Sequence, residues 1–178
     1  MESDDAWIGN AQPYLTPRQE GERDAWTAEA AARGYRGTQQ LLGVEEVAPP
    51  RIVRDFLKTE RAVVRRRLIM LNEQPVELAD SYYSTRIARD TLLAKTGKIR
   101  GGAITLLASM GFAPEDNPIE DVAAAIATSS QCDALNLPPG TPVLILTRLT
   151  RSTTGEPMEV SVMTMTRHLR YRQTSEVS

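Results

Sequence analysis

Strand-like runs bounded by turn-type residues occur in two pairs along the chain. The first pair, 62–71 and 76–83, is separated by the turn-type sequence NEQP. The second pair, 143–151 and 158–167, is separated by STTGEP. Turn-type residues between two such runs favour antiparallel pairing. The sequence therefore predicts two β-hairpins.

Short helices are expected around these hairpins. They are predicted at 24–33, 51–58, 87–93, 101–110 and, capped by Ser129 or Ser130, at 129–135. The first of them ends at Gly34, and the second follows two prolines. Residues 40–47 are predicted to form a strand, whereas the period of 117–128 does not distinguish a helix from a strand.

These elements predict an α+β fold, an antiparallel sheet with short helices packed on it. Residues 1–23 mix Asp, Pro, Gly and Gln without an apolar period, so they are expected to form an extended arm or linker. Trp7, Ile8 and Tyr14 could attach this arm to the body of the domain.

Composition excludes several functional classes. The 178 residues, 41% hydrophobic and 25% charged, are typical of a globular domain, and a net charge of −2 argues against a protein that itself grips a nucleic-acid backbone. One histidine and one cysteine, Cys132, leave no basis for a zinc cluster or a disulfide framework, so we expect no metal and no cofactor. No apolar run approaches the roughly 20 residues that span a bilayer. Without a signal peptide either, a cytoplasmic location with no membrane partner is expected.

The first hairpin carries charged residues that could form a binding site. Because side chains alternate between the faces of a strand, Arg65 and Arg67 share one face and Arg66 takes the other. On the returning strand one face carries Glu77, Ser81 and Tyr83. Paired arginines suit a carboxylate or a phosphate. The pattern by itself favours the alternative, in which the arginines form a solvated face or pair with acidic residues across the strands.

Other chemically interesting residues give weaker signals. Glu159 lies on the same predicted face as Ser161, Met163 and Met165, and the pattern alone favours an exposed glutamate above a sulfur-rich core. Gly101 and Gly102 at a helix start could present amides to an anion, although a glycine pair indicates little by itself. Cys132 has no adjacent base and is expected to be a small buried hydrophobe.

Taken in order, these segments resemble the UTRA domain, the effector domain of the HutC branch of the GntR family of regulators. AVVRRRLIMLNEQPVELADSYY at 62–83 resembles its first hairpin, and GGAITLLASMG at 101–111 resembles its short helix. The strand at 120–128, the L-x-L and G-x-P-V elements at 135–143 and the closing hairpin through GEPME at 155–159 follow in the order of the family.

The resemblance implies a chorismate-lyase-like α+β fold, usually dimeric, that binds a small metabolite and alters operator affinity. By position, Arg65 and Arg67 match anion-gripping arginines, and Glu77 and Glu159 match acidic pocket residues. The effector site implied by the resemblance, with neighbours, comprises Arg65, Arg67, Glu77, Ser81, Tyr83, Gly102 and Glu159.

The resemblance also implies how the chain is organised. Residues 24–172 are expected to form the ligand-binding domain, between the arm at 1–23 and a tail at 173–178. Since residues 1–23 cannot supply three helices and a wing, the winged helix-turn-helix that precedes such domains is expected to be absent from this chain. Operator DNA would then be contacted only through an attached domain.

Two departures from the family pattern concern the ligand. Sugar-phosphate-sensing members carry a Ser-x-Tyr pair where this chain has Gly102 and Ile104, and Met165 stands where a tyrosine is common. A more apolar ligand with one carboxylate is therefore expected, rather than a phosphorylated amino sugar.

Three functions remain open, with the sensing domain favoured. An enzyme of the chorismate lyase type would also use Arg65, Arg67 and Glu77, and would release pyruvate from chorismate. An interaction module would leave both arginines open to solvent on a surface without a pocket.

Overall fold

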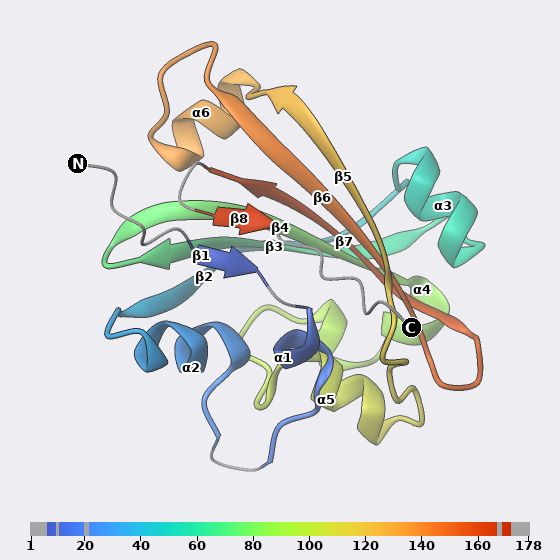
Figure 1. Ribbon diagram of the computed structural model, residues 1–178. Coiled ribbons are helices and arrows are strands. Elements are labelled where there is room, and N and C mark those ends of the chain that lie inside the picture. Colours follow the sequence, from blue (N-terminus) through green and yellow to red (C-terminus); the bar gives the residue numbers. More distant parts are fainter. Residues whose placement is uncertain (1–6, 10, 20–21, 167–168, 172–178) are drawn as a thin grey trace, which may run out of the picture.

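A six-stranded antiparallel sheet forms the centre of the computed structural model, which describes residues 7–9, 11–19, 22–166 and 169–171 (Figure 1). Its strands run in the order β2-β3-β4-β7-β6-β5. They are β2 (Gly37–Val47), β3 (Ala62–Leu71), β4 (Gln74–Ser84), β5 (Ile119–Ile126), β6 (Pro142–Arg151) and β7 (Pro157–Met165). The predicted α+β class is confirmed.

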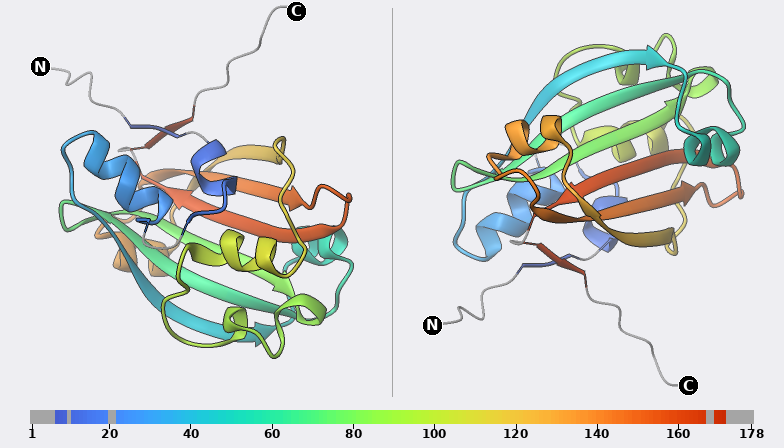
Figure 2. Two further views of the ribbon diagram at one scale, coloured as in Figure 1. Left: turned by 90° about the horizontal axis from the view of Figure 1, so that it is seen from below. Right: turned by 90° about the horizontal axis from the view of Figure 1, so that it is seen from above.

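Helices cover both faces of the sheet (Figure 2). On one face lie α1 (Gln12–Leu15), α2 (Ala25–Ala32) and α5 (Gly102–Ser109), and on the other lie α3 (Arg51–Leu57) and α6 (Ser129–Leu135). The short helix α4 (Thr85–Ala88) and the 3-10 turn η1 (Leu92–Ala94) connect β4 to α5. A separate parallel pair joins β1 (Trp7–Gly9) to β8 (Leu169–Tyr171).

The first hairpin forms where the sequence predicts it, with a tighter turn. Asn72 and Glu73 both have left-handed φ angles, 47° and 67°, as a two-residue type I′ turn requires. The Asn72 Oδ1 atom accepts a hydrogen bond from the Arg36 backbone N–H at 2.9 Å, which stabilises the turn. The last two residues of NEQP therefore belong to β4 rather than to the turn.

Register in the hairpin decides which side chains share a face. Arg65 lies opposite Ser81 and Arg67 lies opposite Ala79. Both arginines line a space shared with residues of α2 and α5, while Arg66 lies on the face of Val64, which packs against α3. The predicted separation of Arg66 from its two neighbours is therefore confirmed.

Several predicted elements differ in detail. The stretch at 87–93 is two short pieces, because Asp90 has a φ of 67° that a right-handed helix does not allow. The cap of α6 is Thr128 rather than Ser129 or Ser130, since its Oγ1 accepts from the Gln131 backbone N–H. The undecided stretch at 117–128 contains the strand β5.

The arm is not extended throughout, because residues 12–15 form α1. Tyr14 attaches it to α2, as expected, by donating a hydrogen bond to Glu29 Oε2 at 2.8 Å, and Leu15 is buried beside it. The backbone of Trp7 and Ile8 pairs with β8. Residues 1–6 of the arm and the tail at 173–178 lie outside the described residues.

Helix α2 packs so closely on β2 that only glycine fits at the crossing. Trp26 is buried and its Nε1 donates to the Met70 carbonyl at 2.9 Å, which holds the indole in place. A Cβ atom at Gly37 would lie 2.8 Å from that Nε1 and 2.6 Å from the Ala30 Cβ. Neither neighbour is the free end of a flexible side chain.

We therefore expect Gly37→Ala to lower the free energy of unfolding by about 1–3 kcal/mol, the usual cost of overpacking a core. Urea denaturation followed by circular dichroism measures the change. Gly43→Ala, on the same strand, is the matched control, because a Cβ there has its nearest neighbour at 3.8 Å. Equal losses in the two variants would contradict the packing argument.

Candidate functional site

A cavity of about 620 Å³ lies between the sheet and the helices α1, α2 and α5. Its floor is the face of the sheet that carries Arg65 and Arg67, and its other walls come from residues 13–18, from the start of α2 and from residues 97–104. This volume is typical of a pocket for a small molecule.

Six of the seven predicted site residues line this cavity: Arg65, Arg67, Glu77, Tyr83, Gly102 and Glu159. The seventh, Ser81, lies beneath the lining and is almost fully buried. Strand register brings them together, since β4 pairs with β3 on one side and with β7 on the other. Residues about 90 positions apart in the chain thus share one face of the sheet.

Arg67 combines a positive charge with an unused donor. Its Nη1 donates to Gln39 Oε1 at 3.2 Å and its Nη2 donates to Ser81 Oγ at 2.9 Å, while the buried Nε has no hydrogen-bond partner. Within the described residues no carboxylate lies within ion-pair distance of this guanidinium. A buried donor without a partner is costly, so the site is suited to an acceptor supplied by a ligand.

A directed chain of hydrogen bonds leads from Arg67 to Glu159. Because an arginine only donates, Ser81 accepts from Arg67 and is free to donate to Ser161 Oγ at 2.9 Å. Ser161 in turn donates to Glu159 Oε1. Tyr83 donates to Glu159 Oε2 at 3.3 Å, and burial together with the nearby Glu159 raises the pKa of Tyr83, so its phenol keeps its proton. The predicted exposed glutamate is therefore wrong, because Glu159 is buried.

Glu77 is a carboxyl group at the cavity that has no pairing partner among the described residues. It lines the cavity, and no other side chain in the described part of the chain forms a hydrogen bond or an ion pair with it. Burial raises the pKa of Glu77 to about 7, against the opposing effects of the positive charges of Arg67 and Arg148. Near neutral pH this group can accept a hydrogen bond when charged or donate one when protonated.

Arg65 has a different environment from Arg67. Its guanidinium donates to four backbone carbonyls: those of Leu92 at 3.2 Å, Leu93 at 3.0 Å, Lys95 at 2.7 Å and Gly97 at 2.8 Å. Only 6% of the residue is exposed, and burial lowers its pKa. Its donors are thus directed largely at the protein itself.

The sequence did not identify Arg148 and Tyr14 as site residues. The Arg148 Nε donates to Glu120 Oε1 at 2.7 Å, and its guanidinium lies over the Tyr14 ring, 5.9 Å from the centroid. The alternation along β6 could have placed Arg148 on the cavity face, because it lies opposite Ser161. Nothing in the aperiodic arm indicates that Tyr14 reaches the cavity.

One of the open functions, the interaction module, can be compared with this geometry. An interaction module called for exposed arginines and no pocket, whereas Arg65 and Arg67 line a cavity.

Within the described ranges no three His, Cys, Asp or Glu side chains lie close enough to hold a metal ion. None of the described helices is long and apolar enough to cross a membrane.

Comparison with known families gives a match over most of the chain. The family model described as the UTRA domain matches residues 32–172. An uncharacterized HTH-type transcriptional regulator of Streptomyces coelicolor is 29% identical over 154 residues, which cover 80% of this chain and 56% of the relative. The chain thus spans little more than half the length of that protein.

Solved structures show the same fold. The ligand-binding domain described for a GntR-family transcriptional regulator of Bordetella bronchiseptica has a TM-score of 0.66 at 22% identity, covering 90% of this chain and 95% of that one. The C-terminal domain of the histidine utilization repressor of Pseudomonas syringae has a TM-score of 0.64 at 19% identity, covering 80% and 99%.

The raised pKa of Glu77 predicts how stability depends on pH. The folded protein keeps a proton on this carboxyl up to about pH 7, whereas the unfolded chain releases it near 4.5. Stability therefore falls as the pH rises from the unfolded pKa through the folded one. We expect Glu77→Gln to remove this decrease in stability. Above pH 7 the free energy of unfolding of the variant should exceed that of the wild type by about 2–3 kcal/mol.

Urea titrations of both proteins measure this difference. They are carried out at a series of pH values that runs from the unfolded pKa of Glu77 to just above its folded pKa. The two proteins should converge at the acid end of the series. Parallel stability curves across it would mean that Glu77 ionises normally in the fold.

Proposed function

The chain belongs to the UTRA domain family, and we propose that it is the effector-binding domain of a GntR-type regulator of the HutC branch, with a small anionic metabolite as its effector. The observation that carries the proposal is the buried Nε of Arg67, a charged donor without a partner on a residue that lines a cavity of ligand size. A carboxylate would satisfy this donor and offset the charge.

The remainder of the cavity supports an effector with an apolar body. Leu146, Met163 and Met165 form part of the floor, and Ile104 lies in the opposite wall. Gly102 adds no side chain, and a Cβ at this position would meet no atom within 4 Å, so space is left beside it. Glu77 supplies one polar partner for a hydroxyl or amine of the effector.

The proposal includes a DNA-binding partner domain. The relative from Streptomyces coelicolor is named an HTH-type regulator. A sensing domain of this kind acts by changing the operator affinity of an attached helix-turn-helix domain, in proportion to the difference in effector affinity between two arrangements of the protein. The effector is bound and released without a chemical step.

Arg67→Ala should weaken effector binding. We expect a screen of small mono- and dicarboxylates by thermal shift to yield compounds that raise the melting temperature, and calorimetry to show at least a tenfold loss of affinity in the variant. Loss of a hydrogen bond to a charged group, worth about 1.5–3 kcal/mol, is sufficient for that factor.

Arg66→Ala is the matched control for this prediction. Arg66 is the next residue on the same strand, but it faces the other side, where it pairs with Glu45 at 3.1 Å and Asp80 at 3.6 Å. The Arg66→Ala variant should bind the effector with an affinity within about twofold of that of the wild type. Binding that survives Arg67→Ala would place the site elsewhere, and a carboxylate recovered in altered form would favour the enzyme.

We also propose a homodimer, with the β5 edge as its interface. Within the described sheet β5 pairs only with β6, so its outer edge carries unpaired backbone groups. Ile119 and Ile126 on this strand are 57% and 63% exposed. Unpaired backbone groups beside exposed apolar side chains are suited to pairing with the same strand of a second copy.

The double variant Ile119→Lys and Ile126→Lys tests this interface. Two charges on the edge strand should convert a dimer into a monomer, as measured by light scattering after size exclusion, with the circular dichroism spectrum unchanged. Leu42→Lys, on β2 at the opposite edge of the sheet, is the control and should remain dimeric. A monomeric wild-type protein at micromolar concentration would refute the proposal.

A further inference from the structure

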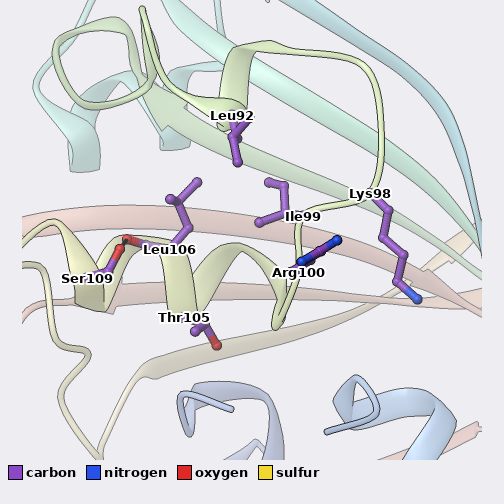
Figure 3. A pocket seen from close by; sticks show the side chains of 7 residues that line it. All are labelled: Leu92, Lys98, Ile99, Arg100, Thr105, Leu106 and Ser109. Carbon is purple, nitrogen blue, oxygen red and sulfur yellow. Dashed lines mark hydrogen bonds between the residues drawn. The ribbon is translucent and has the colours of Figure 1, made fainter. Parts of the chain in front are cut away.

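Residues 95–100, between η1 and α5, form a thin wall that separates two hollows. On its inner side lies the main cavity, and on its outer side lies a second hollow of about 340 Å³ between η1 and α5. Figure 3 shows Leu92, Ile99 and Leu106 around this outer space. Lys98 and Ile99 line both hollows, so the wall here is one layer of chain thick.

The wall is not stabilised by regular secondary structure of its own. Residues 95–100 form neither a helix nor a strand. Gly97 lies within this stretch and Gly101 and Gly102 follow it, and the three have positive φ angles of 127°, 72° and 83°. Glycine adopts such angles without a steric penalty, which makes these positions suitable hinges. The wall contributes one side chain, Ile99, to the core that surrounds Tyr83, next to Leu93 of η1.

Arg65 connects this wall to the sheet. Its guanidinium donates four hydrogen bonds to carbonyl oxygens, two of them in η1 (Leu92 and Leu93) and two in the wall (Lys95 and Gly97). The two hydrogens of its Nη1 are shared among three acceptors, so this nitrogen has none left for a ligand. Arg67, two residues along the same strand face, keeps the unpaired Nε. The two arginines thus have different tasks.

We propose that Arg65 is a positioning residue that holds the wall at 95–100 closed, and that this wall is the gate to the main cavity. Arg65 sets the position of the gate, whereas the anionic group of the effector is bound by Arg67. The holding role rests on the hydrogen bonds of Arg65 alone, and the statement about effector entry rests on the function proposed above.

Thiol labelling with a maleimide, measured without any effector, tests the gate. Reporter thiols are introduced by Ile99→Cys in the wall and by Met163→Cys in the cavity floor, each in a Cys132→Ser background. The native Cys132, buried in α6 on the far face, is the reporter of global opening. Each reporter is combined with Arg65→Gln and, as the matched control, with Arg66→Gln, since Arg66 faces away from the cavity and pairs with Glu45 and Asp80.

Arg65→Gln should speed labelling at positions 99 and 163 by at least about tenfold, since it removes several charge-assisted hydrogen bonds. Labelling of Cys132 should stay within about twofold, and Arg66→Gln should leave all three rates within that range. Arg65→Lys keeps the charge but cannot reach four carbonyls at once, so it should give intermediate rates. It also provides the same test if Arg65→Gln does not fold.

Three outcomes would overturn parts of the proposal. Unchanged labelling at position 99 would show that Arg65 does not hold the wall. Faster labelling at position 99 but not at 163 would show that the wall moves without opening the cavity. Equal acceleration at Cys132 would reduce Arg65 to a contributor to overall stability. Because no effector is needed, failure here is distinguishable from failure of the proposed binding function.

Discussion

Two guanidinium groups on one buried face of β3 impose the constraint on which the arrangement of the site depends. Removing a cation from water is costly unless its donors find acceptors and its charge is offset. Arg65 is satisfied by carbonyls of η1 and of the loop that follows it. Arg67 is satisfied only in part, by Gln39 and by the hydroxyl of Ser81, and its Nε stays unpaired. The hydrogen bonds that Arg65 donates to Lys95 and Gly97 hold this loop against the sheet.

The same constraint explains why a cavity exists beneath the helices. The layer over this face consists of short helices and a loop, and it packs firmly at Trp26 of α2 and around Tyr83 near α5. Between these two anchors the floor presents Arg67 and Glu77, side chains that cannot be covered by an apolar helix without loss of hydration. A water-filled or ligand-filled space there costs less than burying both groups in a dry core.

Much of the fold was predictable because its signals are local. The hairpin at β3 and β4 follows from turn-type residues between strand-like runs, and α2 and α3 begin and end at capping residues, prolines or glycine. Alternation correctly placed Arg65 and Arg67 on one face and Arg66 on the other. The division of 87–93 into two pieces was not predictable, since it depends on the backbone of Asp90.

By itself, the sequence determined which side chains share a face and that this face carries both charges and sulfur-rich apolar residues, because the period of a strand is a local property. Only the tertiary structure decided what each group touches. It placed Ser81 under Arg67, brought Tyr14 from the aperiodic arm to the cavity and directed the donors of Arg65 at carbonyls about 30 residues away. Such contacts depend on how distant segments pack, and no periodicity in the chain encodes them.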